Sequence, residues 1–393
     1  MSPDMIFTSE SVTPGHPDKL CDQISDAAID AFLREDAGAR AVVECALATG
    51  VVFLAARFAA DARVDLSTLA RKVILDAGYC AEGFDARSCS ILTSSAELPL
   101  EAREPPPDAL DEEAIARRVA HEQANVFGFA CRDTPELMPA PISFAHRVAR
   151  ALDGARRAGL VPSLSPDAKT QVSVEYRRGR PSRVHGISLT LAFDEPAPGP
   201  DARERIRALA LEALAGGEVA PDAGTTVHIN AGGPFEIGGP ARHAGLTGRK
   251  NGIDTYGEFA RQSGSALSGK DPSRIERAGA YAARHAAKNI VAAGLADRCE
   301  VHLAYVVGQA QPLSLSVETF GSGVMSDEAL SKRLSAVLDF RPAAIVRRFA
   351  LRTRPASAAP TGFYLPLATF GHFGRPDLDL PWEAGDAAEA LRG

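Results

Sequence analysis

Two strand-length patterns joined by a short turn constrain the fold of this chain most. Apolar and polar residues alternate over residues 171–176 and again over 184–193, and the turn-like sequence RGRPS at 178–182 lies between them. Parallel neighbours need a crossover of about a dozen residues or more, so these two strands must pair antiparallel. The pattern therefore favours an α+β fold over a doubly wound parallel sheet.

Further strand and helix patterns follow one another along the 393 residues. Helical spacing of apolar residues covers 20–32 and 278–293. Alternation typical of strands covers 51–58, 90–94, 225–230, 301–307 and 313–320. Clusters of proline and glycine interrupt the chain at 105–107, 196–200, 216–224 and 355–362. We expect three units of ordinary domain size, at 1–103, 114–235 and 236–393.

Charge and composition exclude several classes of protein. The 43 basic and 50 acidic residues give a formal charge of −7, which argues against a nucleic-acid binder with a general basic surface. No stretch has the length and apolar character of a membrane span or an export signal. The six cysteines include no C-x-x-C pair, which is typical of reduced thiols, so we expect a cytoplasmic protein.

The first candidate site is the segment 9–19, SESVTPGHPDK, which ends where a helix should begin. Pro17 suits the first helical turn, where free N–H groups attract anions. His16, Asp18 and Lys19 therefore stand where a phosphate or a metal could be held. The alternative is an ordinary helix start, with Asp18 favourable to the helix dipole. Three further aspartates at spacing four are expected to form a solvated face: Asp22, Asp26 and Asp30.

Two glycine-rich segments are the next candidates. The segment 232–250 ends in Arg249 and Lys250, and dense glycines let backbone amides approach a polyanion. The segment 264–271 reads GSALSGKD, which matches a P-loop except that Asp271 stands where Ser or Thr is needed. A phosphate-binding Lys270 is still predicted there. The alternatives are solvated tight turns for the first segment and a capping-box role for Glu276 after the second.

Together with Asp167 and Lys169, these segments gather cations around glycine-rich backbone in an acidic protein. Such a cluster predicts a site for a triphosphate, with carboxylates left over to hold Mg²⁺.

The chain resembles the S-adenosylmethionine synthetase family over nearly all of its length. The matching segments are FTSESVTPGHPDKLCDQISDAAIDA at 7–31, LMPAPISFAHR at 137–147, DAKTQVSVEY at 167–176, GLTGRK at 245–250, SGKDPSRIERAGAYAARHAAKNIVAAGLADRC at 268–299 and GHFGRPDLDLPWE at 371–383. The resemblance implies three similar βαββαβ units with pseudo-threefold symmetry. It also implies a homo-oligomer, a dimer or a dimer of dimers, with active sites shared across the dimer interface.

The resemblance further implies transfer of the adenosyl group of ATP to methionine or a methionine-like acceptor, with the triphosphate released and cleaved to phosphate and pyrophosphate. On this basis the catalytic residues are His16, Lys169, Arg249 and Lys270. The same comparison assigns ATP binding to these four residues and to Asp167, Phe235, Lys250 and Asp271. Asp18 and Glu276 correspond to the ligands of two Mg²⁺ ions, and Glu44 corresponds to a glutamate associated with K⁺.

The acceptor pocket is where the chain departs from the family. Arg57 replaces a glutamate and His243 replaces an aspartate, both of which receive the methionine ammonium in the family. The altered pocket is completed by Glu122, Arg274 and Val307. Two like charges about 4 Å apart repel by about 4 kcal/mol at an effective dielectric of about 20. An acceptor other than methionine, a catalytically silent regulatory subunit and an ATP triphosphatase without an acceptor are therefore alternatives to S-adenosylmethionine formation.

Overall fold

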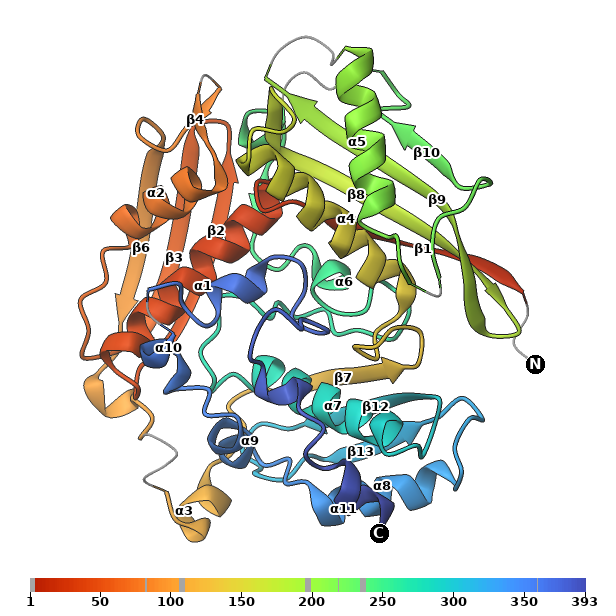
Figure 1. Cartoon of the computed structure of the whole chain (residues 1–393). Coiled ribbons are helices and arrows are strands. Elements are labelled where there is room, and N and C mark those ends of the chain that lie inside the picture. The colour runs from red at the N-terminus through yellow and green to blue at the C-terminus, as the bar shows by residue number, and fades with distance from the viewer. Residues whose placement is uncertain are drawn as a thin grey trace.

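The computed structural model describes residues 4–81, 83–105, 110–194, 199–217, 219–233, 238–358 and 360–393. Three larger sheets, each with helices packed on it, surround the middle of the molecule, and β4 (Cys80–Ala81) and β5 (Phe84–Asp85) form a small fourth sheet (Figure 1). Phe235, predicted to bind ATP, lies outside the described residues. The mixture of helices and mixed-orientation sheets confirms the α+β class.

The element order repeats. The first set is β1 (Met5–Val12), α1 (Pro17–Glu35), β2 (Arg40–Ala48), β3 (Val51–Ala59), α2 (Leu66–Ala77) and β6 (Ser90–Glu97). The second set is β7 (Ala124–Cys131), α4 (Ala140–Arg157), β8 (Leu164–Arg177), β9 (Arg180–Phe193), α5 (Pro200–Glu212) and β10 (Thr226–Ile229). The third is β11 (Gly245–Leu246), α7 (Ile275–Ala292), β12 (Arg298–Tyr305), β13 (Ser314–Glu318) and α8 (Asp327–Val337), with no final strand among the described residues. The order βαββα(β) therefore occurs three times.

Shorter elements connect these sets. They are β4 (Cys80–Ala81), β5 (Phe84–Asp85), η1 (Leu100–Ala102), α3 (Glu112–Arg117), η3 (Gly239–Ala241), α6 (Asn251–Asp254), α9 (Pro342–Arg348), α10 (Arg354–Ser357), η4 (Leu365–Ala368), η5 (Pro381–Glu383) and α11 (Ala388–Arg392).

The first strand of each set pairs in the sheet of another set. β1 pairs antiparallel with β8, β7 with β12, and β11 with β2, which is the same pairing repeated cyclically. Figure 1 shows red β1 within the yellow-green sheet and gold β7 within the blue-green sheet. The exchange supports the pseudo-threefold arrangement and ties the three sheets together. Since each sheet mixes strands from two of the units 1–103, 114–235 and 236–393, those boundaries stay a prediction about sequence segments.

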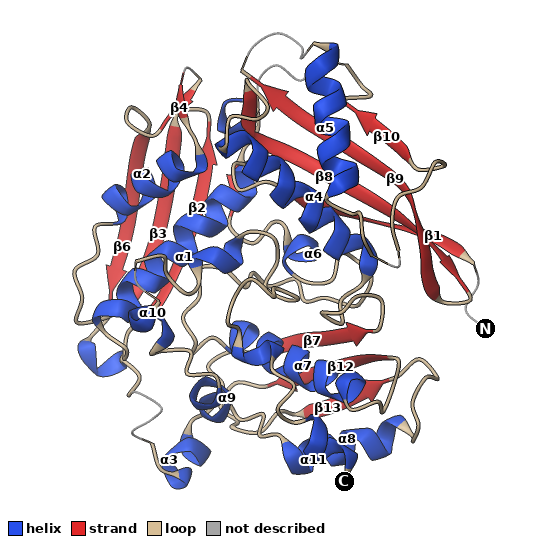
Figure 2. Cartoon of the chain, viewed as in Figure 1, coloured by secondary structure: helices blue, strands red, loops and turns tan. Residues whose placement is uncertain are grey.

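Helices cover one face of each sheet, as the blue ribbons in front of the red strands show (Figure 2). Along β3, Val52, Leu54 and Ala56 are buried, whereas Val51 and Phe53 on the other face are exposed. This alternation is the period-two pattern of a sheet with one packed face. The expected hairpin is confirmed: β8 and β9 pair antiparallel, joined at Arg178 and Gly179.

The prediction that Asp22, Asp26 and Asp30 form a solvated face is wrong, because all three are at most 1% exposed. Polar backbone folds over this side of α1. Asp22 accepts a hydrogen bond from the Gly248 N–H at 2.7 Å, and Asp26 accepts one from the Gly269 N–H at 2.9 Å. Spacing of four residues marks one helix face but does not say what covers it.

β7 and α7 approach each other most closely at Gly128. A Cβ placed there would lie 1.9 Å from the backbone carbon of Ala283. Since that atom belongs to a buried helix, Gly128→Ala should lower the free energy of unfolding by roughly 3 kcal/mol, the upper end of the usual cost of overpacking. Denaturant unfolding measures the loss. Gly50→Ala is the control, because a Cβ there meets nothing within 4 Å; similar losses in both variants would contradict the packing argument.

No helix in the described parts of the chain has both the length and the apolar character needed to cross a membrane.

Candidate active site

His16 and Asp18 stand at the start of α1. His16 is the N-cap residue, and its Nδ1 accepts a hydrogen bond from the Asp18 backbone N–H at 3.2 Å. Pro17 occupies the first helical turn, as expected. Both side chains are almost completely buried, at 1% and 2% exposed. The segment therefore combines an ordinary helix start with two buried functional groups.

Asp167 and Lys169 reach the same place from β8. Asp167 accepts hydrogen bonds from the Gly239 N–H at 2.8 Å and from His243 Nε2 at 3.0 Å. The His243 ring lies 5.0 Å from the His16 ring, measured between centroids. Lys169 is half-buried, and among the described residues it has no hydrogen-bond acceptor. Its ammonium is thus available to an anion.

Arg249 and Lys250 complete this first cluster from the loop after β11. Arg249 Nε lies 3.0 Å from a carboxylate oxygen of Asp18, and Lys250 Nζ lies 3.1 Å from Glu10. Asp18 also accepts a hydrogen bond from the Leu246 N–H at 3.0 Å. The predicted metal ligand Asp18 is therefore held by the loop that carries two predicted phosphate ligands.

A second cluster surrounds Lys270. Its ammonium forms an ion pair with Glu276, which also accepts a hydrogen bond from Ser265 at 2.5 Å. α7 begins after Arg274 without a side-chain cap, so the capping-box interpretation of Glu276 is wrong. The glutamate instead turns toward the lysine. Here too a predicted metal ligand is paired with a predicted phosphate ligand.

Asp271 is buried, and its carboxylate is bound by other groups of the protein. It is 1% exposed, accepts a hydrogen bond from the Ala41 N–H at 2.9 Å and pairs with Arg352 at 3.1 Å. These contacts fix the backbone of the adjacent Lys270 against β2, where Lys270 lies opposite Val42. This placement favours a role for Asp271 in positioning Lys270.

The two clusters lie apart along α1. Leu246 of the first is anchored at Asp18 and Gly269 of the second at Asp26, eight residues later, which is a rise of about 12 Å at 1.5 Å per residue. The pairing of both loops with strand β2 gives a similar separation. Leu246 lies opposite Ala46 and Lys270 opposite Val42, four residues apart, or about 13 Å. The backbone segments that carry the two clusters are therefore anchored about 12 Å apart within one subunit.

Comparisons with known proteins show the family of the chain. Family models described as the N-terminal, central and C-terminal domains of S-adenosylmethionine synthetase match residues 4–98, 117–235 and 237–384. Together these models match most of the chain. The chain belongs to the S-adenosylmethionine synthetase family.

Individual relatives match the chain at full length. An S-adenosylmethionine synthase of Synechococcus sp. (strain JA-3-3Ab) is 45% identical over 98% of this chain and 97% of its own length. One from Gloeobacter violaceus is also 45% identical, over the same shares of the two chains. One from Salinispora tropica is 45% identical over 98% of each chain. The resemblance seen in the sequence is therefore confirmed.

The residues that depart from the S-adenosylmethionine synthetase pattern are scattered in this structure. Arg57 lies on the open face of the sheet, in one cross-strand row with Val42 and Lys270. Glu122 and Arg274 form an ion pair with each other. His243 belongs to the first cluster, 3.0 Å from Asp167. Val307 is exposed in the turn after β12. Within one subunit no contact joins these groups into a single pocket among the described residues.

The anchoring of loops by the buried aspartates Asp22, Asp26 and Asp30 of α1 is the feature that sequence reasoning missed in this family member. Each one holds a different loop: Asp18 and Asp22 hold the loop of Arg249, Asp26 holds the loop of Lys270, and Asp30 accepts hydrogen bonds from the N–H groups of residues 363–365. The sequence signal that could have indicated this is the glycine in each loop. Glycine leaves the backbone N–H groups accessible, and aspartate carboxylates accept hydrogen bonds from such groups. The aspartates set the positions of the cations.

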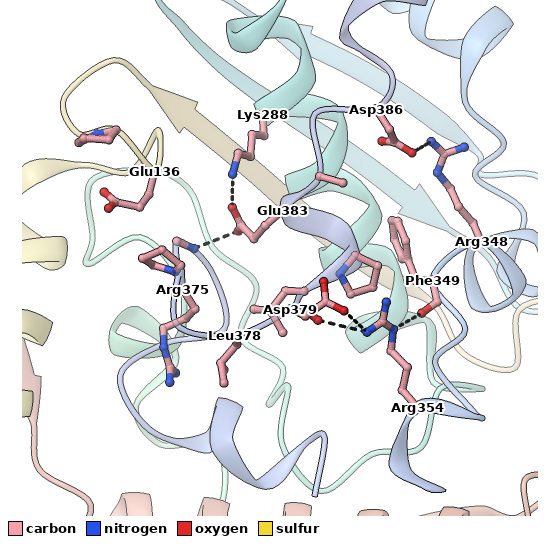
Figure 3. Close-up of a pocket in the computed structure, with 16 residues that line it drawn as sticks. Glu136, Lys288, Arg348, Phe349, Arg354, Arg375, Leu378, Asp379, Glu383 and Asp386 are labelled. Atoms are coloured by element: carbon pink, nitrogen blue, oxygen red, sulfur yellow. Dashed lines mark hydrogen bonds and ion pairs between the residues drawn. The ribbon is translucent and has the colours of Figure 1, made fainter. Parts of the chain in front are cut away.

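The pocket in Figure 3, about 650 Å³ in volume, lies away from both clusters. Its walls include residues of α7 and α9. Three of its cations pair with carboxylates of the protein: Lys288 with Glu383 at 2.7 Å, Arg348 with Asp386 at 2.9 Å and Arg354 with Asp379 at 3.1 Å. None of the predicted site residues lines it. The pocket is therefore not the candidate active site.

Burial lowers the pKa of His16 to about 3, and Lys169 and Lys250 add to the shift while Asp167 opposes it. The folded pKa is below the unfolded value, so the unfolded state gains a proton first as the pH falls below about 6.5. Between about pH 6 and pH 4, the free energy of unfolding of the native protein should fall with decreasing pH. The fall should be steeper than that of His16→Gln by up to about 1.4 kcal/mol per pH unit. Urea unfolding across this range measures the difference. Parallel pH curves for the two proteins would contradict a buried neutral histidine.

Proposed function

We propose that this enzyme transfers the adenosyl group of ATP to the sulfur of methionine and so makes S-adenosylmethionine. The observation that carries the proposal is the pairing in each cluster of a phosphate-type cation with a metal-type carboxylate, Arg249 with Asp18 and Lys270 with Glu276. Its relatives named S-adenosylmethionine synthase are 43–45% identical over nearly the whole chain. When a Mg²⁺-bound triphosphate enters, the cation of each pair can bind phosphate and the carboxylate can bind Mg²⁺.

In the proposed reaction the methionine sulfur attacks C5′ of ATP. The S–C5′ bond forms, the C5′–O5′ bond breaks, and the triphosphate leaves with the bonding electrons. Lys169, Arg249, Lys250 and Lys270 stabilise the charge that develops on the leaving group, which is the largest effect such a site can supply. His16 is neutral, and its free Nε2 is suited to donate a hydrogen bond to a phosphate or ribose oxygen. Water then cleaves the bound triphosphate to pyrophosphate and phosphate.

Asp18 and Glu276 are the proposed ligands of two Mg²⁺ ions. Each has a carboxylate beside a displaceable cation, and Mg²⁺ typically binds through one or two carboxylates together with substrate phosphates. Bound Mg²⁺ would neutralise charge on the triphosphate. Glu44, exposed on β2, is the proposed residue near K⁺. Asp167 and Phe235 are assigned to the adenosine on the resemblance alone.

Methionine is the favoured acceptor over a different, anionic one. Among the described residues of one subunit, no contact joins Arg57 to His243, the other altered residue of the expected ammonium pocket. The identity of 43–45% to synthases also favours methionine. A silent regulatory subunit is disfavoured by Lys169, Arg249 and Lys270, since such a subunit needs no leaving-group site. The cytoplasmic location stays a prediction from the sequence.

Self-association is part of the proposal. The open face of the sheet formed by β2, β3 and β6 carries a row of apolar side chains, with Phe53, Leu92 and Leu246 each 43–55% exposed. Exposed apolar patches of this kind mark interaction sites. Since the two cationic clusters of one subunit lie about 12 Å apart, we assign them to different active sites. A second subunit on this face completes each site.

Product analysis tests the proposed function. Purified protein is incubated with ATP, Mg²⁺ and K⁺, with and without methionine, and mass spectrometry follows S-adenosylmethionine while phosphate and pyrophosphate are assayed. Methionine-dependent S-adenosylmethionine with equal amounts of phosphate and pyrophosphate is expected. ATP cleavage that is independent of methionine would indicate a triphosphatase, and no turnover at all would indicate a silent subunit; either outcome overturns the proposal.

A further inference from the structure

Three side chains beside the start of α1 form a compact set of metal-type donors. One ligand atom each from His16, Asp167 and His243 can be chosen so that all lie within 4.8 Å of one another. They come from three separate elements: the N-cap of α1, strand β8 and the loop that follows η3. Such a set is held by the fold and does not depend on one flexible loop.

Two of these side chains have polar atoms without a partner. His16 Nε2 and Asp167 Oδ1 are buried and make no hydrogen bond, and the residues are only 1% and 2% exposed. Buried polar atoms are normally paired, so unpaired ones on two neighbouring side chains indicate a place built for a ligand. The His243 side chain is 29% exposed and leaves this place open to solvent on one side.

The donor set selects the kind of ion. Imidazole nitrogens together with a carboxylate suit Zn²⁺ and Co²⁺, whereas Mg²⁺ prefers oxygen ligands alone. Three protein ligands with an open fourth position are also the usual arrangement of an accessible zinc site. We propose that the nucleotide-free protein binds one Zn²⁺ ion at His16, Asp167 and His243, a site separate in chemistry from the proposed Mg²⁺ sites.

The surroundings supply a second element of such a site. In the structure Nδ1 of His16 accepts the Asp18 backbone N–H, which places the ring proton on Nε2. Metal binding at Nε2 therefore moves this proton to Nδ1 and gives up that hydrogen bond, and a carboxylate oxygen of Asp18 lies 3.8 Å from Nδ1. A small rotation makes it the acceptor, and histidine ligands commonly donate to a carboxylate in this way. The charges facing the site are mixed: Asp167 and Asp18 favour a cation, whereas Lys169, Lys250 and Arg249, which pairs with Asp18 at 3.0 Å, oppose one.

One consequence rests on the proposed function. His16 and Asp167 are also assigned to ATP, so the zinc ion and ATP exclude each other. Zn²⁺ should therefore inhibit competitively with ATP, and the histidine at position 243 makes this chain more sensitive than one with aspartate there. The metal affinity itself is measured without nucleotide and does not depend on turnover.

Metal titration of the full-length, nucleotide-free protein tests the inference. Co²⁺ is followed by its visible absorption and Zn²⁺ by calorimetry, both in excess Mg²⁺. We expect one site, at least tenfold weaker in His243→Ala and in Asp167→Asn, with the Co²⁺ absorption lost when ATP is added. The matched control is His185→Ala, because His185 is exposed on β9, far from the cluster in sequence. The control should bind as the native protein does.

Two results would overturn the site. Native affinity in both His243→Ala and Asp167→Asn would show that the metal binds elsewhere, and a loss in His185→Ala alone would assign it to surface histidines. If the variants weaken binding but ATP fails to displace Co²⁺, the zinc site stands and the assignment of ATP to His16 fails. If the enzyme proves inactive on methionine, the metal titration is unaffected.

Discussion

Lys270→Ala is expected to lower the turnover of ATP by about 10²–10³-fold, the usual cost of removing one preorganised charge donor. The lysine is held in place from both sides, by its ion pair with Glu276 and by the pairing of its backbone opposite Val42. The first cluster of the same subunit does not replace it, because we assign that cluster, anchored about 12 Å away along α1, to another active site. Steady-state rates of phosphate and S-adenosylmethionine formation measure the effect.

The control for Lys270→Ala is Lys332→Ala. Lys332 is 76% exposed on α8 and pairs with the equally exposed Glu328, so its loss should leave the rate unchanged. Thermal unfolding of both variants separates a loss of chemistry from a loss of folded protein. If Lys270→Ala keeps more than roughly a third of native turnover, the leaving-group role assigned to this lysine is wrong.

Asp26→Asn is expected to lower the free energy of unfolding by about 3–5 kcal/mol, because it leaves a buried guanidinium without its counter-charge. Arg277 and Asp26 are both fully buried, and their two hydrogen bonds measure 2.7 and 2.9 Å. Asp26 also holds the Gly269 N–H, so the variant should loosen the loop of Lys270. Denaturant unfolding measures the stability, and the rate of ATP turnover reports on the loop.

Asp76→Asn provides the matched control for this ion pair. Asp76 pairs with Lys72 on the surface of α2, where both side chains are more than half exposed. Exposed pairs of this kind contribute about 0–1 kcal/mol. Arg277→Met combined with Asp26→Asn should recover part of the stability, since it removes the unpaired charge. Equal losses for Asp26→Asn and Asp76→Asn would contradict a buried ion pair that organises the loop.

The sequence alone predicted the type of fold better than the pairing of its strands. The RGRPS turn required the β8–β9 hairpin, and the family motifs implied the repeated βαββαβ order. The exchange of β1, β7 and β11 between sheets was not foreseen, because period-two alternation identifies a strand but not its partner. β11 is only two residues long and carries no such pattern.

The burial of the aspartates on α1 could not be predicted from the sequence for a related reason. A charged stripe at spacing four is usually a solvated face, and nothing local in the sequence shows that loops more than 200 residues away fold over it. The capping-box interpretation failed for a different reason, because the Glu276 carboxylate pairs with Lys270, six residues earlier in the chain, and not with the N-cap backbone. Long-range pairs of charged residues are visible only in three dimensions.

The division of one active site between two subunits is the central claim, and subunit mixing tests it most directly. Arg249→Ala and Lys270→Ala, each nearly inactive alone, are unfolded together, refolded and assayed for S-adenosylmethionine. Half of the dimers should be mixed, and each mixed dimer holds one site with both residues native, so about a quarter of native activity should return. Activity that stays at the level of the separate variants would show that both clusters of one subunit serve the same site.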